Sequence, residues 1–394
     1  MSNTTTDSMA LRRSAGGAED DRQKVVNPIT ALQAFGQSVW LDYLRRSLFT
    51  SGEFSRLILD DGLRGVTSNP SIFEKAIAGS TDYLDALQEI ERYRDLEPMA
   101  LYEALAIRDI REAADLLRPV YDATGRVDGY VSLEVSPYLA NDADGTAAEA
   151  ERLWKAVDRP NLMVKIPGTA AGVPAIATSI DKGININVTL LFSIEAYKAV
   201  ALAFVEGLEK RAARGEPIDR IASVASFFVS RIDTKIDDAI DAGTGGEEAK
   251  ALKGKVAIAN AKAAYVWYQD FIQSDRWQAL AAKGAMPQRL LWASTGTKNP
   301  DYSDVLYLDT LIGRDTVNTV PPKTLDAFRD HGTAAETLTE DPDGARHVLA
   351  EAERLGLDLQ GVTETLVEEG VASFSKAFDD LLGAIAAKHP AEAT

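Results

Sequence analysis

A lysine within an apolar run is the residue whose setting most strongly indicates chemistry. Residues 161–169 read NLMVKIPGT, so Lys165 has apolar neighbours on both sides and a Pro-Gly pair shortly after it. Burial disfavours the charged form of a lysine side chain, and the neutral amine is a nucleophile that can attack a ketone to form a Schiff base. The imine is an electron sink that permits cleavage of a carbon–carbon bond. The structural alternative is a lysine that only forms a buried ion pair with Glu134.

Two carboxylates are the candidate proton-transfer groups for such a reaction. Glu134 lies between Leu133 and Val135 in a second apolar run, where a carboxylate is costly unless it is paired or used. Asp42 ends a third apolar run, and its alternative role is to cap the helix that follows. Schiff-base chemistry needs acid–base groups, so we expect both carboxylates to lie beside Lys165.

Other polar side chains at the ends of apolar runs extend the candidate site. The amides and the threonine have a simple structural alternative as turn or helix-capping residues, and the serines carry little information alone. They are Asn69, Asn187, Thr189, Ser226 and Ser294. Two cations, Arg231 and Lys298, follow the sixth and seventh runs. A phosphate group could lie between them, assisted by backbone N–H groups and Ser294. Each cation alone would more often belong to the surface, but their positions after the sixth and seventh runs favour a phosphate site.

Eight short runs along the chain must position these side chains, and we predict a strand at each. Most of them are almost entirely apolar, which is typical of parallel strands covered on both faces. Helix-like segments separate them, and this alternation predicts an α/β fold, a (β/α)8 TIM-type barrel with the chemistry at the C-terminal ends of the strands. The predicted strands are residues 39–42, 64–67, 130–134, 162–166, 184–188, 221–226, 290–294 and 305–308.

The intervening helices and the chain ends complete the predicted organisation. Apolar spacing and capping residues predict helices at residues 146–157, 193–214, 230–242 and 247–272. From about residue 322 we expect additional C-terminal helices that pack on the barrel and close it, at residues 323–330, 344–355 and 363–387. Residues 1–27 are polar and rich in small residues, so we predict a mobile tail there and a single barrel domain from residue 28 to 394.

Composition excludes several classes of function. The chain has 394 residues and no cysteine, which excludes disulfides, cysteine-based zinc sites and thiol nucleophiles and fits a cytoplasmic protein. Its three histidines show no metal-ligand spacing, so we expect no metal site, although His331 could act as a lone base. The net charge of −18 disfavours nucleic acid and anionic membrane surfaces as partners. An anionic substrate would therefore need a local basic pocket.

Six blocks of the sequence, in order, resemble the signature blocks of transaldolases, and more narrowly those of the longer bacterial subgroup. The resemblance runs from about residue 31 to at least residue 321. It implies a class I aldolase barrel of the pentose phosphate pathway that needs no metal or organic cofactor. Such an enzyme transfers a dihydroxyacetone unit from sedoheptulose 7-phosphate to glyceraldehyde 3-phosphate, giving erythrose 4-phosphate and fructose 6-phosphate. The blocks read GVTSNPSIFEKAI, VSLEVSPYL, LMVKIPGT, INVTLLFS, ASVASFFVSRID and LLWASTGTKNP.

The resemblance implies catalytic roles for four residues. Lys165 resembles the lysine that forms the Schiff base. Asp42, in SVWLDYLRR, is similar to the acid–base aspartate that takes the proton from the C4 hydroxyl during cleavage. Glu134 resembles the glutamate that, through a water held with Thr189, moves protons during imine formation and hydrolysis.

The resemblance also implies a set of substrate-binding residues. The two amides are similar to residues that hold hydroxyls of the three-carbon unit, one serine lies beside that unit, and the arginine resembles the phosphate-binding one. A second arginine is common after the seventh strand in this family, whereas the block here is ASTGTKNP, so a serine and a lysine are expected in its place. The expected substrate-binding residues are Asn69, Asn187, Ser226, Arg231, Ser294 and Lys298.

Two alternatives stay open on the sequence. The first is a fructose 6-phosphate aldolase that releases free dihydroxyacetone, although the pairing of Glu134 with Thr189 and the long chain favour transfer. The second is a non-catalytic barrel that binds sugar phosphates, but such a protein should have lost at least one of Asp42, Glu134 and Lys165, and all three are present. We expect sugar phosphates as the partners of this chain, and a monomer or homodimer.

Overall fold

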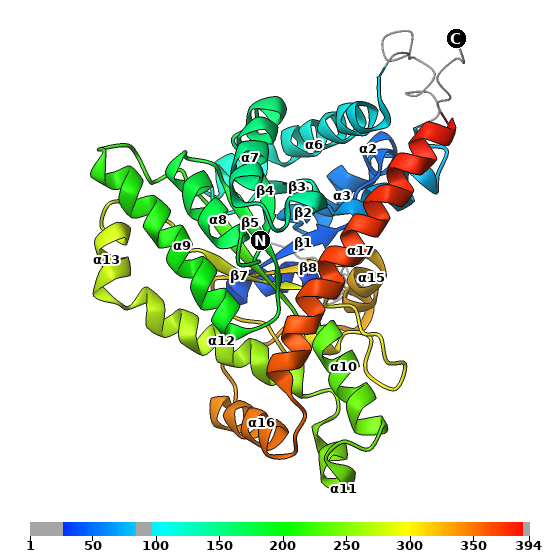
Figure 1. The fold of residues 1–394 in the computed structure, drawn as a ribbon, viewed down its shortest axis with the longest axis vertical. Coiled ribbons are helices and arrows are strands. Elements are labelled where there is room, and N and C mark those ends of the chain that lie inside the picture. Colours follow the sequence, from blue (N-terminus) through cyan, green and yellow to red (C-terminus); the bar gives the residue numbers. More distant parts are fainter. Residues whose placement is uncertain (1–26, 84–95, 389–394) are drawn as a thin grey trace, which may run out of the picture.

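Eight parallel strands form a closed barrel in the computed structural model, which describes residues 27–83 and 96–388 of the chain. Each strand pairs with its neighbours in chain order, and β8 pairs with β1 to close the barrel. Helices surround the strands (Figure 1). The predicted (β/α)8 fold is confirmed. Residues 1–26 of the predicted tail lie outside the described residues, while Asn27 caps the first helix, α1 (Pro28–Ala31).

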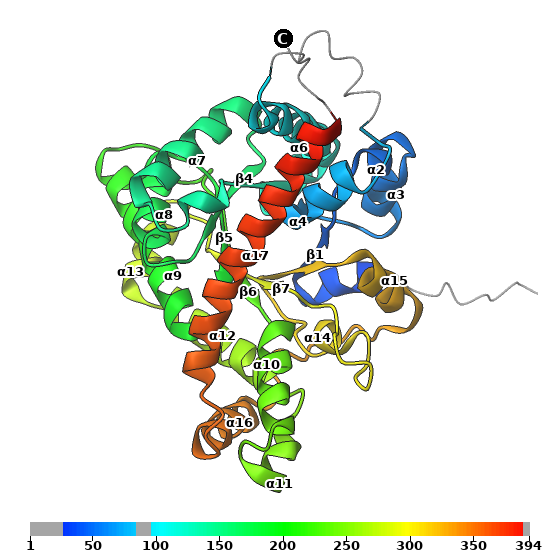
Figure 2. The same cartoon turned by 45° about the vertical axis from the view of Figure 1, so that its right-hand side comes forward.

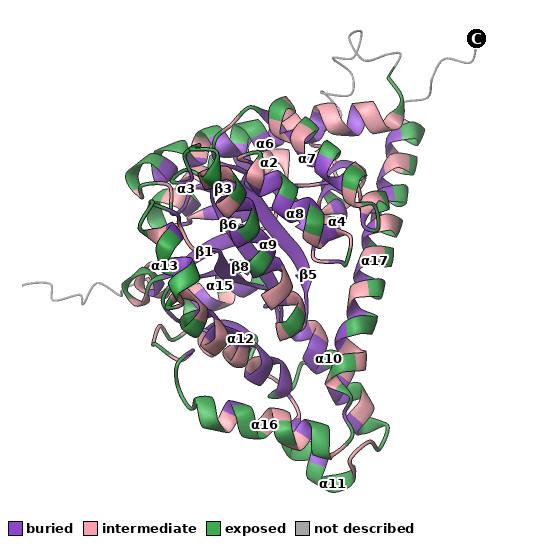
Figure 3. Cartoon of the chain, turned by 60° about the vertical axis from the view of Figure 1, so that its left-hand side comes forward, coloured by how far each residue is buried: buried purple, intermediate pink, exposed green. Residues whose placement is uncertain are grey.

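Seven of the eight predicted strands coincide with observed strands, with small shifts at their ends. In Figure 3 the strands are the most buried part of the molecule, and the surrounding helices expose their outer faces. The strands are β1 (Gln37–Asp42), β2 (Gly65–Thr67), β3 (Tyr130–Glu134), β4 (Leu162–Pro167), β5 (Ile186–Leu191), β6 (Ser223–Phe228), β7 (Arg289–Ala293) and β8 (Thr316–Val320).

The prediction of the eighth strand at residues 305–308 is wrong. Those residues begin the short helix α14 (Leu306–Asp309), and a short apolar run cannot distinguish one buried helical turn from a strand. The true β8 reads TVNTV, and its polar side chains conceal a fully buried strand. Each of those side chains has a partner: Thr316 binds Gln37, Asn318 accepts from Thr295, and Thr319 meets Thr67.

The helices between the strands follow the sequence pattern, with one break. The predicted helix at residues 247–272 is divided by a turn at Gly254, where φ is +69°, a conformation that glycine adopts without strain. The helices of the barrel wall are α6 (Pro98–Ala123), α7 (Ala143–Val157), α8 (Gly172–Asp181), α9 (Ile194–Ala213), α10 (Ser230–Asp241), α11 (Gly246–Ala249), α12 (Val256–Ile272) and α13 (Asp275–Ala281).

The last helix crosses the mouth of the barrel. α15 (Pro322–His331) packs beside β1 and α1, and α16 (Pro342–Arg354) packs on α12. α17 (Leu359–Lys388) runs diagonally over the strands in two views (Figures 1 and 2). It packs on α4 (Pro70–Phe73), which follows β2, on α6, which precedes β3, and on α10, which follows β6. Its Gly370 lies so close to β5 that an added Cβ would be 2.8 Å from Leu190 Cδ2. The predicted C-terminal packing helices are therefore present, and α17 covers the end that carries the candidate site.

The opposite end of the barrel is filled by a buried ion pair. Arg289 Nη2 lies 3.0 Å from Asp128 Oδ1, and both side chains are at most 10 % exposed. Ser38 Oγ donates to Asp128 Oδ2 at 2.8 Å and accepts from Arg289 Nη1 at 2.9 Å. A Cβ at Gly65 would meet the ring of Trp40 at 2.6 Å, so the interior is tightly packed here. This floor ties β1, β7 and the start of β3 together.

Candidate active site

The predicted site residues gather around one cavity of about 1130 Å³ at the C-terminal ends of the strands. Helix α17 contributes Phe374 to its wall. Of the ten predicted residues, only Glu134 and Asn187 are not in the wall of this cavity, and each contacts a residue that is. The predicted residues in its wall are Asp42, Asn69, Lys165, Thr189, Ser226, Arg231, Ser294 and Lys298.

Lys165 points into the barrel from β4, and its strand neighbours Val164 and Ile166 are fully buried. Strand pairing places Glu134 and Asn187 beside it on β3 and β5, in the same register. The amine donates to the carbonyl of Ser68 at 3.1 Å and lies 3.7 Å from Glu134 Oε2. Lys165 is only 5 % exposed, so the apolar strand delivers a buried amine to the cavity, as the sequence predicted.

Glu134 is a carboxylate in a poorly hydrated setting. Its side chain is 8 % exposed, and its Oε2 has no hydrogen-bond donor among the described residues. Burial raises the pKa of Glu134 to about 7; the negative charge of Asp42 adds to this rise, while Lys165 opposes it. A carboxyl group with a pKa near neutrality can both release and accept a proton under physiological conditions.

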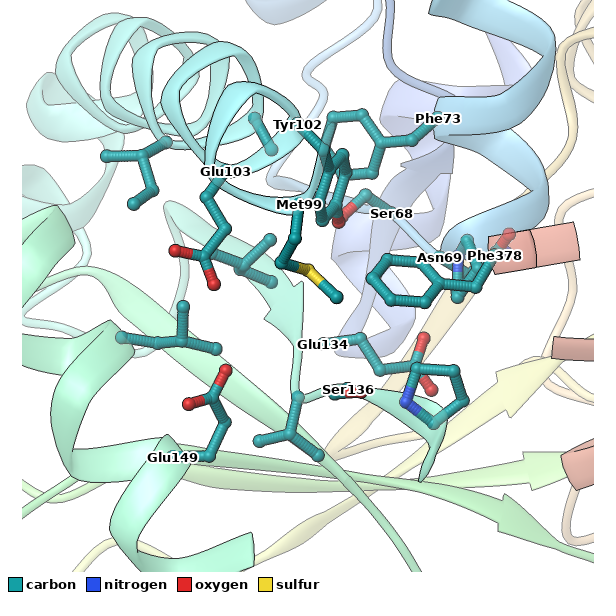
Figure 4. Close-up of a pocket in the computed structure, with 17 residues that line it drawn as sticks. Ser68, Asn69, Phe73, Met99, Tyr102, Glu103, Glu134, Ser136, Glu149 and Phe378 are labelled. Carbon is teal, nitrogen blue, oxygen red and sulfur yellow. The ribbon is translucent and has the colours of Figure 1, made fainter. Parts of the chain in front are cut away.

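A small second cavity explains much of the burial around Glu134. Its volume is about 30 Å³, and it lies between the β3 end and the helices α6 and α17. Figure 4 shows Glu134 facing a group of mainly apolar side chains that includes Met99, Tyr102, Phe73 and Phe378. The same burial, together with the charge of Glu134, raises the pKa of Tyr102. The wall also contains the carboxylates of Glu103 and Glu149, but most of its side chains are apolar and contribute to the desolvation of Glu134.

Asp42 stands at the end of β1, on the other side of the cavity. Thr67 Oγ1 donates to Asp42 Oδ1 at 2.7 Å and is itself 2.6 Å from Thr319 Oγ1. Burial raises the pKa of Asp42, and the charge of Lys165 opposes that rise. The next helix, α2 (Arg46–Thr50), has no side-chain cap, so Asp42 is not the helix cap that the sequence left open. The sequence did not single out Thr67, which fixes this carboxylate.

Three polar side chains form a buried chain across β3, β5 and β6. Asn187 Nδ2 donates to Ser132 Oγ at 2.9 Å, and Ser226 Oγ donates to Asn187 Oδ1 at 2.7 Å. Sequence reasoning missed Ser132, although it lies two residues before Glu134 and therefore on the same face of β3. The chain fixes the amide of Asn187 beside Lys165. By contrast, Asn69 does cap a helix, because its side chain accepts from Ile72 N at the start of α4, yet it also lines the cavity.

Thr189 occupies an irregular part of β5. The pairing of β5 with β6 shifts register between Val188 and Leu191, and Leu190 has a φ of +60°. Such bulges redirect side chains and are common beside active sites. Thr189 Oγ1 is buried and has no hydrogen-bond partner among the described residues, although Thr189 lines the cavity. The hydroxyl is therefore available to a bound molecule.

Two cations mark the β6 and β7 side of the cavity. Arg231 lies in the first turn of α10, 5.2 Å from the ring of Phe228, and no carboxylate among the described residues forms an ion pair with it. Burial lowers the pKa of Arg231, against the charges of Asp42 and Glu369. Lys298 is exposed on the loop after β7, and Ser294 Oγ lies 2.9 Å from the Ser230 hydroxyl at the start of α10.

The wall of the cavity holds seven cationic side chains and five carboxylates, so cations outnumber anions there although the chain as a whole is acidic. The cationic side chains in its wall are Arg56, Lys75, Lys165, Arg231, Lys298, Lys323 and Arg329.

His331, considered as a lone base, is not in this wall: its ring is exposed and lies 2.8 Å from Asp304 and 3.2 Å from Asp330. No three His, Asp or Glu side chains in the described residues are placed to hold a metal ion. Within residues 27–83 and 96–388, no helix is long and apolar enough to cross a membrane.

Comparison with known proteins gives a consistent result over nearly the whole chain. Residues 39–385 match the family model described as transaldolase/fructose-6-phosphate aldolase. A transaldolase of Trichodesmium erythraeum is 49 % identical over 373 residues, which cover 92 % of this chain and 98 % of that protein. A transaldolase of Thiobacillus denitrificans is 51 % identical over 350 residues, covering 89 % and 97 %. Transaldolase 2 of Nostoc punctiforme is 48 % identical over 374 residues, covering 91 % and 97 %.

Proposed function

The chain belongs to the transaldolase/fructose-6-phosphate aldolase family, and we propose that it catalyses the transaldolase reaction through a Schiff base at Lys165. As a transaldolase it is a transferase. The reaction moves a dihydroxyacetone unit from sedoheptulose 7-phosphate to glyceraldehyde 3-phosphate and leaves erythrose 4-phosphate and fructose 6-phosphate. The observation that carries the proposal is the buried amine of Lys165, placed 3.7 Å from Glu134 in a cavity that also exposes Asp42.

Schiff-base formation uses the amine and the glutamate. The amine of Lys165 attacks the C2 carbonyl of the ketose phosphate, and the carbinolamine then loses water to give an iminium ion. Glu134, whose pKa is raised to about 7, supplies the proton that the departing hydroxyl needs. We assign the hydroxyl of Thr189 to the water that accompanies this step, because Thr189 lines the cavity and its Oγ1 has no hydrogen-bond partner among the described residues.

Cleavage uses the aspartate. Asp42 takes the proton from the C4 hydroxyl, the C3–C4 bond breaks, and its electron pair moves into the iminium group to form an enamine. The aldose phosphate leaves, and the three-carbon unit stays on Lys165. A second aldose phosphate then accepts the enamine carbon at its aldehyde, the new C4 oxygen takes the proton back from Asp42, and hydrolysis of the imine frees the product. Thr67 keeps the carboxylate aimed through its 2.7 Å hydrogen bond.

The remaining predicted residues bind the substrate in this proposal. The Asn187 amide, held by two hydrogen bonds, and the Asn69 amide offer polar groups to the hydroxyls of the three-carbon unit, with Ser226 beside them. Arg231 and Lys298, assisted by Ser294, bind the phosphate group at the start of α10. Lysine contributes a point charge and arginine a bidentate donor, so Arg231 should set the phosphate orientation.

Borohydride trapping tests the Schiff base. Reduction in the presence of fructose 6-phosphate should leave a three-carbon adduct on the peptide that contains Lys165, detectable by mass spectrometry. Lys165→Ala should lose both adduct and activity, while Lys155→Ala, which removes an exposed lysine paired with Glu151, should keep both. An adduct elsewhere, or full activity of Lys165→Ala, would reject the mechanism.

An acceptor assay separates transfer from simple cleavage. Turnover of fructose 6-phosphate should depend on an added aldose phosphate, and a rate that is the same without acceptor would indicate an aldolase. That alternative is not favoured, because curated relatives near 50 % identity carry the name transaldolase over nearly the whole chain. A cytoplasmic location and a monomeric or homodimeric state stay predictions from the sequence.

A further inference from the structure

Two tyrosines connect the segment after β7, which bears Lys298, to helix α10. The Tyr302 hydroxyl donates to Asp237 Oδ2 at 2.6 Å, and the Tyr307 hydroxyl donates to Asp233 Oδ2 at 2.9 Å. The two aspartates lie one helical turn apart on the same face of α10. We call these two hydrogen bonds the tyrosine clamp. Burial raises the pKa of both tyrosines, so both hydroxyls stay protonated donors near neutral pH.

Each aspartate of the clamp is itself fixed by a second hydrogen bond. Asp237 Oδ1 accepts from Gly254 N at 3.2 Å, and Asp233 Oδ1 accepts from Ala257 N in the first turn of α12. Both carboxylates are buried, at 7 % and 1 % exposure. The tyrosines therefore bind to acceptors that are held in place, and these bonds fix the segment after β7 relative to α10.

The turn at Gly254 is shaped to admit Tyr302. A Cβ at Gly254 would lie 2.9 Å from Tyr302 Cζ, and the φ of +69° disfavours any side chain there. Ring and turn thus pack together where the Tyr302–Asp237 bond forms. A further contact holds the start of this segment, where the Ser294 and Ser230 hydroxyls are hydrogen-bonded.

None of the clamp residues lines the large cavity, whereas Arg231 and Lys298, which lie on the two segments that the clamp joins, do line it. Arg231 lies in the first turn of α10, two residues before the first clamp aspartate, and Lys298 lies four residues before the first clamp tyrosine. We propose that the tyrosine clamp positions Lys298 relative to Arg231 and thereby sets how well the cavity holds the phosphate group of its sugar substrate. The clamp residues are positioning residues, and this inference rests on the proposed function.

The test compares Tyr302→Phe with the wild type and with Tyr265→Phe. Tyr302 is half-buried, so its variant should fold, and Tyr265 provides a matched control because its hydroxyl donates one 3.0 Å bond to Arg314 O away from the cavity. Tyr302→Phe should raise KM for fructose 6-phosphate and Ki for inorganic phosphate by roughly fivefold, the effect of one ordinary hydrogen bond, with kcat within about twofold of wild type. Borohydride trapping of dihydroxyacetone, which lacks a phosphate, should be unchanged. Tyr265→Phe should alter none of these values.

A double-mutant cycle shows whether the clamp acts through Lys298. In a Lys298→Ala background, adding Tyr302→Phe should raise KM by much less than fivefold. Unchanged KM and Ki in the single variant, a loss confined to kcat, or the same factor in both backgrounds would overturn the inference. Inorganic phosphate should also raise the melting temperature of the wild type more than that of Tyr302→Phe. That measurement needs no turnover, so it tests the clamp separately from the proposed reaction, which is tested by borohydride trapping and by the activity of Lys165→Ala.

Discussion

Replacing Glu134 by glutamine should stabilise the protein at alkaline pH while it slows catalysis. Burial raises the pKa of Glu134 from an ordinary 4.5 to about 7. Because the pKa is higher in the folded state, the stabilising effect of protonation is complete below pH 4.5 and is lost as the pH rises through about 7. At about 1.4 kcal/mol for each tenfold change in proton affinity, that difference corresponds to roughly 3 kcal/mol.

Glutamine has nearly the shape of the protonated acid, but it does not ionise. The free energies of unfolding of Glu134→Gln and wild type should therefore differ by at most about 1 kcal/mol at pH 5, and the variant should be more stable by roughly 3 kcal/mol at pH 8. Turnover should fall by about 100-fold, since the proton shuttle is lost. Urea unfolding followed by circular dichroism at several pH values measures the first effect, and a coupled transfer assay measures the second.

The exposed Glu368 of α17 provides the control for this experiment. Glu368→Gln should change the free energy of unfolding at pH 8 by no more than about 0.5 kcal/mol, as is usual for an exposed substitution. If the difference between Glu134→Gln and wild type did not grow between pH 5 and 8, or if the variant were the less stable at pH 8, burial would not be what sets the proton affinity of Glu134.

Three further substitutions separate stability from activity. Asp128→Ala leaves the buried Arg289 of the barrel floor unpaired and should cost about 3–5 kcal/mol of unfolding free energy, measured by urea titration, with KM unchanged. Gly370→Val forces α17 away from Leu190 and should lower the melting temperature through overpacking worth about 1–3 kcal/mol, and an unchanged melting temperature would contradict the close contact. Thr189→Val should leave the melting temperature unchanged or higher, because Oγ1 has no partner to lose, yet should slow turnover at least tenfold; normal turnover would exclude Thr189 from the reaction.

The sequence predicted the barrel because seven strands are apolar runs that both faces of a covered parallel sheet require. It failed at β8, where TVNTV carries polar side chains whose partners, such as Gln37 and Thr67, lie far away in the sequence. Local pattern cannot reveal such partners. The apolar turn of α14 at residues 305–308 was therefore predicted to be the eighth strand in place of β8.

The site was predictable to the extent that strand ends meet at one face of a barrel. Lys165 and Glu134 are conspicuous because charged groups rarely interrupt apolar strands. The groups that orient them are not conspicuous: Thr67 and Ser132 are ordinary polar residues until the strands are paired. The tyrosine clamp is likewise invisible in sequence, since Tyr302 and Asp237 are 65 residues apart.

The closure of the barrel between β1 and β8 has a consequence for how activity arises during folding. Gln37 and Thr316, which are bonded across that seam, are 279 residues apart. Pairing over such a separation carries a large loop-closure cost and forms late. Asp42 stands on β1, and its partner Thr67 is braced by Thr319 of β8. A refolding chain should therefore regain its secondary structure before its ability to cleave a carbon–carbon bond, because the acid–base aspartate is fixed only when the last seam closes.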